Sequence, residues 1–109
     1  MATEPQPRPV ARIWRGAVRA ADRDDYLAYL ETTGIAEYRD TPGNRSVQVL
    51  RRDVGDRTEF VIVTLWDSRR HIAAFAGDDI DRAVFYPEDD RYLVERDDTV
   101  THYDVVTYD

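Results

Sequence analysis

Cysteine and lysine are absent from this 109-residue sequence. Without cysteine, the chain has no disulfide, no thiolate nucleophile and no Cys-ligated metal site. All fifteen basic residues are arginines, and 22 acidic residues outnumber them, so the formal net charge is −7. An acidic surface repels phosphate groups, which argues against nucleic acid or an anionic membrane as a partner.

Long hydrophobic runs are also missing. No apolar stretch approaches the ~20 residues that cross a bilayer, and the N-terminus has no apolar signal core. Pro5, Pro7 and Pro9 stand among polar residues, which predicts a flexible leader over residues 1–9 and one folded domain over residues 10–109. Hydrophobic residues make up 42% of the chain, enough for a core. We therefore expect an acidic, cytoplasmic, single-domain protein.

Hydrophobic periodicity predicts the order β-α-β-β-α-β, with the second helix broken into pieces. Asp22 is the expected N-cap of the first helix, and Gly34 predicts a bend or a close contact within it. The expected elements are strand 10–18, helix 22–38, strands 46–53 and 58–66, helical pieces 68–76 and 80–85, and strand 99–106. This order predicts an α+β, ferredoxin-like split βαββαβ fold, an antiparallel sheet with helices on one face.

The strand over residues 58–66 is apolar on both faces. Phe60, Ile62, Thr64 and Trp66 lie on one side, and Val61, Val63 and Leu65 lie on the other. Such a strand needs helices over one face and another layer over the second. One domain of this size does not easily supply two cores, so a second subunit is the expected cover.

The stretch FVIVTLWDS (60–68), followed by HIAAF (71–75), resembles the signature of the antibiotic biosynthesis monooxygenase family. Further similar segments are IWRG (13–16), TPGN (41–44) and YPEDD (86–90). The resemblance implies a homodimeric α+β barrel in which the sheets of two subunits face each other. It also implies that each subunit holds a pocket between its own sheet and helices, with the Trp66 face toward that pocket.

The haem-degrading branch of this family uses an Asn in the first strand, a Trp ending the third, and an iron-binding His on the second helical segment. Only the Trp is retained here, as Trp66, while the Asn position falls on Trp14. The iron-binding position falls near Val84 or Phe85, neither of which can be an axial ligand. The resemblance therefore disfavours haem degradation.

The cofactor-free branch implies a monooxygenase that acts on a small aromatic or polyketide-like substrate with dioxygen and needs no metal, flavin or haem. Such an enzyme holds the substrate in a water-poor cavity, removes a proton and stabilises the resulting anion. The expected substrate-binding residues are Trp14, Trp66, Ile62, Thr64, Phe75 and Phe85. A purely structural core role stays open for both tryptophans.

Three polar residues are the candidate catalytic groups. Arg12 shares a strand face with Trp14, so it needs an anionic partner in the protein or a ligand unless it reaches solvent. Tyr86 can donate to a substrate oxygen, and His71 can act as a base at a helix start or be a plain exposed residue. His102 is expected at the dimer interface.

Other chemistry has little support in the sequence. The acidic pairs 78–79, 89–90 and 97–98 lack the spacing of a metal loop and are interpreted as caps and solvated surface. No phosphate-binding glycine loop and no nucleophile elbow is present. Two alternatives to oxygenation remain: a non-catalytic ligand-binding or structural dimer, and a non-oxidative cyclase or isomerase using the same cavity.

Overall fold

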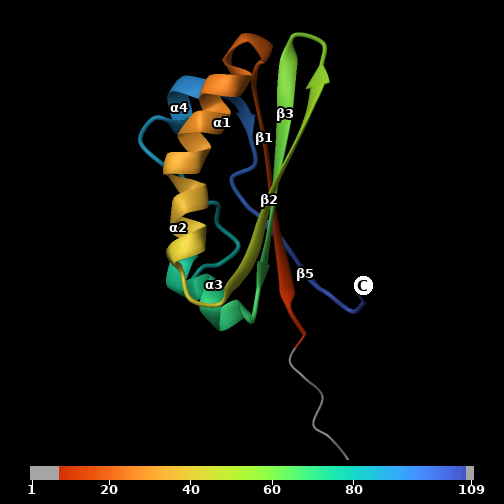
Figure 1. Cartoon of the computed structure of the whole chain (residues 1–109), viewed down its shortest axis with the longest axis vertical. Helices are drawn as coiled ribbons and strands as arrows, with labels where there is room; N and C mark the ends of the chain where they lie inside the picture. Colours follow the sequence, from red (N-terminus) through yellow and green to blue (C-terminus); the bar gives the residue numbers. More distant parts are fainter. Residues whose placement is uncertain (1–7, 108–109) are drawn as a thin grey trace, which may run out of the picture.

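The computed structural model describes residues 8–107 and shows a five-stranded antiparallel sheet with helices on one face (Figure 1). This confirms the predicted ferredoxin-like α+β fold. No helix within the described range is long and apolar enough to span a membrane. The elements are β1 (Val10–Arg19), η1 (Ala20–Asp22), α1 (Arg23–Thr32), α2 (Gly34–Asp40), β2 (Asn44–Val54), β3 (Arg57–Trp66), α3 (Arg69–Ala76), α4 (Asp89–Tyr92), β4 (Leu93–Arg96) and β5 (Thr101–Asp104).

The predicted leader over residues 1–9 lies outside the described residues except for its last two positions. Of these, Arg8 is exposed and Pro9 is buried. The carbonyl of Pro9 accepts a hydrogen bond of 2.9 Å from the amide of Val105, so the chain is already held against the sheet at Pro9.

The sheet is built around β1. The strand order is β2-β3-β1-β4, and β5 pairs with β1 as well. The single last strand predicted over residues 99–106 is wrong in one respect, because two short strands share that edge of β1. β4 pairs with Gly16–Val18, the chain leaves the sheet, and β5 then pairs with Val10–Ile13. At the interruption the amide of Asp97 still donates to the carbonyl of Arg15 at 3.0 Å, and its carbonyl accepts a hydrogen bond of 2.8 Å from Trp14 Nε1.

The helix after β1 bends as predicted. α1 ends at Thr32, Thr33 takes φ −116° and ψ −97°, and α2 begins at Gly34. Asp22 is the N-cap residue of α1, as predicted, but its side chain makes no capping hydrogen bond. Asp22 has φ −96° and ψ 0°, whereas a capping residue needs an extended backbone to turn its carboxylate back onto the free amides.

The region after β3 matches the prediction only in its first part. Ser68 caps α3 by accepting a hydrogen bond from the amide of His71, and Gly77 follows with φ +87°. The helical piece expected over residues 80–85 is wrong, because this segment has an irregular backbone. Its backbone groups bond to the chain after β4 instead: Ala83 donates to Asp98 and Val100 donates to Asp81.

The two faces of β3 differ in cover, as predicted. Phe60, Ile62, Thr64 and Trp66 are buried under the helices, while Val61, Val63 and Leu65 are only half-buried. The helices in Figure 1 lie on one side of the sheet, and the second side is open in the described chain. The open face therefore presents a strip of aliphatic side chains.

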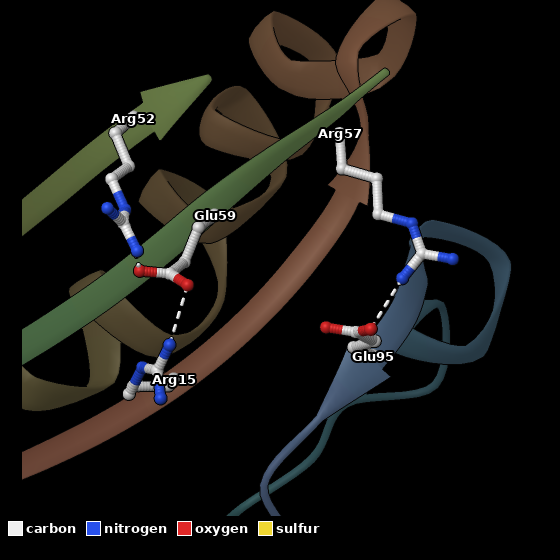
Figure 2. A network of polar contacts seen from close by, with 5 residues as sticks. All are labelled: Arg15, Arg52, Arg57, Glu59 and Glu95. Carbon is white, nitrogen blue, oxygen red and sulfur yellow. Dashed lines mark hydrogen bonds and ion pairs between the residues drawn. The ribbon is translucent and has the colours of Figure 1, made fainter. Parts of the chain in front are cut away.

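Charged side chains border this strip on the same open face (Figure 2). Glu59 of β3 accepts from Arg15 of β1 at 2.6 Å and from Arg52 of β2 at 3.2 Å. Arg57 pairs with Glu95 of β4 at 2.6 Å. Hydrogen bonds from Arg15 and Arg52 lower the pKa of Glu59, so its carboxylate stays ionised and links three strands.

Candidate active site

A cavity of about 30 Å³ lies between the sheet and the helices. Its walls come from β1, β3, α1, α2, the segment 84–86 and α4. The lining residues are Arg12, Trp14, Tyr26, Leu30, Gly34, Tyr38, Ile62, Val84, Phe85, Tyr86 and Asp89. A cavity of this volume holds no more than a few water molecules, so an occupant with an aromatic ring has to displace part of the wall.

Arg12 is the most unusual member of this lining. Its side chain comes from the central strand and is 2% exposed, so the alternative that it reaches solvent is wrong. Its Nη2 donates to the carbonyl of Arg82 at 3.0 Å, and its Nε is buried without a hydrogen-bond partner. Within residues 8–107 it forms no ion pair. Burial lowers the pKa of Arg12, yet an arginine stays protonated at neutral pH, so the cavity wall carries a positive charge without a bound carboxylate.

Aromatic groups surround the guanidinium. The Arg12 Cζ atom lies 5.5 Å from the centroid of the Phe75 ring, and the positive charge of Arg12 interacts with the Tyr38 hydroxyl. Burial raises the pKa of Tyr38 and outweighs the opposite effect of Arg12, so Tyr38 stays a neutral phenol that can donate a hydrogen bond. Arg12 and Tyr38 together offer N–H and O–H donors to an oxygen atom in the cavity.

Asp89 is a cavity residue that the sequence interpretation missed, since the pair 89–90 was assigned to caps and solvated surface. Asp90 is exposed, but Asp89 is 5% exposed and its Oδ2 accepts from the amide of Tyr86 at 2.6 Å. Burial raises the pKa of Asp89 against the lowering effect of that hydrogen bond. One signal was present: Asp89 lies three residues before the aromatic residue Tyr92, which packs against the core, and this spacing places both on one helix face.

Tyr86 also lines the cavity, but its hydroxyl is already engaged. It donates to Glu37 of α2, which ties the segment 84–86 to the helix layer. Burial and the contact with Glu37 raise the pKa of Tyr86, so it is a phenol rather than a phenolate. The structure therefore brings the predicted residues Arg12 and Tyr86 to one cavity, with Tyr86 closing one side of it.

The predicted aromatic wall is present in part. Trp14, Ile62 and Phe85 line the cavity, and the rings of Trp14 and Phe85 meet edge to face with centroids 6.4 Å apart. The other three predicted substrate-binding residues, Trp66, Thr64 and Phe75, lie outside the lining. Trp66 is fully buried and donates to Thr64 Oγ1 at 2.8 Å, so these residues support the wall from behind.

His71 does not reach the cavity. It lies in the first turn of α3, where its Nδ1 is 2.8 Å from Ser68 Oγ. Its ring covers Gly43, since a Cβ built there would come within 2.2 Å of His71 Cγ. The predicted role of His71 as a base at this cavity thus has no geometric support. Asp89, in contrast, is an ionisable group in the cavity lining.

The structure places His102 away from the open face of the sheet, and its position at a dimer interface stays a prediction. His102 stands opposite Arg12 in the β1–β5 pairing, on the helix-covered face, and its side chain is 6% exposed. Its Nδ1 lies 3.2 Å from Asp81 Oδ1, and its Nε2 is buried without a partner. Burial, together with the charge of Arg12, lowers the pKa of His102.

Comparison with known proteins now adds to this geometry. Residues 9–82 match the family model described as antibiotic biosynthesis monooxygenase. The chain belongs to this family. No curated protein matches it.

Solved structures of the antibiotic biosynthesis monooxygenase family share the fold of this member. A Bacillus cereus protein assigned as an antibiotic biosynthesis monooxygenase has a TM-score of 0.66 at 14% identity, covering 94% of this chain and 97% of that one. A similarly assigned protein from Nitrosomonas europaea has a TM-score of 0.66 at 18% identity, with 95% and 96% covered. The haem degrader MhuD of Mycobacterium tuberculosis, with two haems bound in its active site, has a TM-score of 0.58 at 21% identity, with 91% and 97% covered.

The cavity lining of this family member does not fit a haem. Among its described residues, none is a histidine, cysteine or methionine, and the remaining axial donors are three tyrosines. Tyr86 donates to Glu37, and burial raises the pKa of Tyr26 and Tyr38, which opposes the phenolate form that binds iron. Val84 and Phe85 occupy the wall where the resemblance placed the iron ligand.

Proposed function

We propose that this protein is a cofactor-independent monooxygenase of a small aromatic or polyketide-like substrate that binds as an oxyanion. The observation that supports it is Arg12: a buried cation on the wall of an aromatic cavity, with no carboxylate paired to it in residues 8–107. Burying a charge without a partner is costly, so a site that keeps one is suited to a ligand of opposite charge. Membership of the antibiotic biosynthesis monooxygenase family supports the oxidative chemistry.

The proposed reaction begins with a proton transfer. Asp89 accepts a proton from an acidic C–H or O–H group of the substrate, and Arg12 with Tyr38 stabilises the negative oxygen that forms. A carboxylate whose pKa is raised is a stronger base than an ordinary one, and Asp89 has that shift. Trp14 holds the flat ring system in the place that Phe85 occupies against it in the free protein.

The electron-rich anion then reduces dioxygen directly. A carbon–oxygen bond forms, the peroxide takes up a proton, and its oxygen–oxygen bond breaks as water leaves. In balance, a CH₂ group and O₂ give a C=O group and H₂O, so carbon loses four electrons and both oxygen atoms of O₂ are accounted for. The protein supplies position, charge and a proton acceptor, and no electrons of its own.

Binding of such a substrate requires the segment 84–86 to move, because the cavity has room for a few water molecules and not for a ring system. This segment has no regular backbone structure. Insertion of a substrate ring would break two contacts of this segment. These are the hydrogen bond from Tyr86 to Glu37 and the edge-to-face contact of Phe85 with Trp14. We infer that the substrate ring replaces Phe85 against Trp14.

Oxygen uptake with anthrones, which carry the reacting CH₂ group, tests the proposal. We expect one O₂ consumed per carbonyl formed, with one labelled atom from ¹⁸O₂ retained in the product. Arg12→Met should lower kcat/KM by a factor of about 100 or more, while Arg70→Met, at an exposed position of α3, should leave it unchanged. Wild-type protein that consumes no oxygen with any of these substrates contradicts the proposal.

Asp89 favours a second candidate, a non-oxidative isomerase or cyclase. A buried carboxylate with a raised pKa can move a proton between two substrate atoms without dioxygen. Conversion of a substrate under nitrogen, abolished by Asp89→Asn, would identify this activity. Binding of these aromatics without any conversion would identify a ligand-binding module instead.

The proposed enzyme is a homodimer. The open face of the sheet carries Val61, Val63 and Leu65, and Leu50 beside them is 50% exposed. Apolar strips of this kind mark association surfaces. The Glu59 network at its border supplies a polar rim that a second copy can meet.

A further inference from the structure

We propose that His102 positions Arg12 in the cavity wall, and that an anion binding at Arg12 causes His102 to take up a proton. This inference rests on the proposed role of Arg12 as the anion site. It concerns a residue outside the cavity lining, because His102 lines a separate hollow together with Arg69 and Asp81.

The sheet register places the two side chains together. Arg12 of β1 and His102 of β5 are direct partners in an antiparallel pair, so their Cβ atoms lie about 4.5–5.5 Å apart on one face. Both side chains are almost fully buried. Two polar side chains in this relation affect each other's orientation and charge more strongly than exposed neighbours do, because little water screens them.

Asp81 sets the hydrogen-bonding role of His102. Its Oδ1 accepts from Nδ1 at 3.2 Å, which places the proton of a neutral imidazole on Nδ1 and leaves a lone pair on Nε2. Nε2 and Arg12 Nε are the two buried side-chain atoms without a hydrogen-bond partner in the described part of the chain. One is an acceptor and the other a donor, so the neutral imidazole is chemically complementary to the guanidinium it faces.

The charges around His102 oppose its protonation. Arg12 from β1 and Arg69 from α3 are cations, and Arg69 is itself paired with Asp104 at 2.9 Å. Asp81 acts in the opposite direction, but burial and Arg12 outweigh it, and the pKa of His102 is lowered. An anion bound at Arg12 neutralises the repelling charge, so protonation of His102 becomes easier in the complex than in the free protein.

Thermodynamic linkage gives the consequence. If the anion favours protonated His102, then protons favour the anion by the same factor. A rise of one unit in the pKa of His102 on binding corresponds to about tenfold tighter binding at acidic pH. Acidification from pH 7.5 to pH 5.5 should therefore strengthen binding, and binding near pH 6 should take protons from the buffer.

The probe is 2-naphthalenesulfonate, whose charge does not change between pH 5 and pH 8. Titration calorimetry in buffers of different ionisation enthalpy gives both the affinity and the protons taken up. The wild type should bind several-fold more tightly at pH 5.5 than at pH 7.5. His102→Gln keeps a polar side chain opposite Arg12 but cannot titrate. Its affinity at pH 7.5 should equal that of the wild type, and acidification should strengthen its binding less than it strengthens wild-type binding. His102→Phe should bind more weakly at both pH values.

His71→Gln is the matched control, because the chain has only two histidines and His71 lies away from Arg12. It should keep the full pH dependence, and it leaves a single imidazole whose pKa NMR can follow. That pKa should rise when the sulfonate binds. An unchanged pKa, or an identical pH dependence in His102→Gln, overturns the inference. If instead Arg12→Met binds the probe as well as the wild type does, the anion site of the proposed function is wrong.

Discussion

The indole of Trp14 lies across the space that a side chain at position 16 would occupy. A Cβ built at Gly16 would be 2.4 Å from Trp14 Cη2 and 2.8 Å from its Cζ2. Gly16 is two residues along β1 on the same face, so the absence of its side chain lets the ring lie flat along the strand and donate to Asp97. One glycine thus determines where the aromatic wall of the cavity lies.

Gly16→Ala should therefore displace Trp14 and weaken its bond to Asp97. We expect a loss of about 1–3 kcal/mol in the free energy of unfolding, measured by urea denaturation, because an atom is forced into a filled space. In a Trp14→Phe background the same change should cost less, since the shorter ring frees part of that space. An equal loss of unfolding free energy in both backgrounds would show that Trp14 does not contact the side chain at position 16.

Arg12→Met should remove activity and ligand binding without lowering the free energy of unfolding. Removing a buried cation that has no ion pair is expected to leave the free energy of unfolding unchanged or to raise it by about 1–2 kcal/mol. The same variant should lose oxygen consumption and sulfonate binding. A large loss of stability in urea denaturation would mean that Arg12 holds the fold rather than a ligand.

Asp89→Asn tests the raised pKa of the buried carboxylate. A carboxyl group whose folded pKa lies above its unfolded value contributes stability below the unfolded pKa and loses that contribution as pH rises through the folded pKa. The difference in unfolding free energy between wild type and variant should therefore shift in favour of the variant as pH rises from about 3.8. Asparagine can still accept from the Tyr86 amide, so a variant that simply misfolds would contradict this assignment, as would full activity.

Val63→Glu should separate the two subunits. The side chain lies on the open face at the centre of the aliphatic strip, where a charge cannot be buried without a partner. Sedimentation should show a dimer for the wild type and a monomer for the variant. Ala74→Glu adds the same charge at an exposed position of α3 and should stay dimeric. Wild-type protein that sediments as a monomer contradicts the proposed dimer.

Local patterns were enough to predict much of the fold. The alternation in β3 assigned each side chain to its face, and the helical piece predicted over residues 68–76 corresponds to α3, because these signals depend only on neighbours along the chain. Arg12 could be placed on the covered face for the same reason.

The region 77–100 could not be predicted, because its backbone bonds reach across the sequence. The amide of Ala83 donates a hydrogen bond to the carbonyl of Asp98. Trp14 Nε1 donates to the carbonyl of Asp97, which lies 83 residues further along the chain. Asp89 is buried and His102 faces Arg12 as results of that arrangement. These two positions are also the ones on which the site and the further inference depend.

β2 is the outermost strand of the described sheet, so the backbone amides and carbonyls along its free side are open to another extended chain. Three arginines, Arg45, Arg51 and Arg52, are spaced along this strand. These arginines are ion-paired with Asp67, Asp24 and Glu59 respectively, and a second strand laid along β2 would remove water from these charged groups, which discourages strand-to-strand association. Replacement of these arginines by neutral residues should therefore make the purified protein more prone to aggregate through this edge.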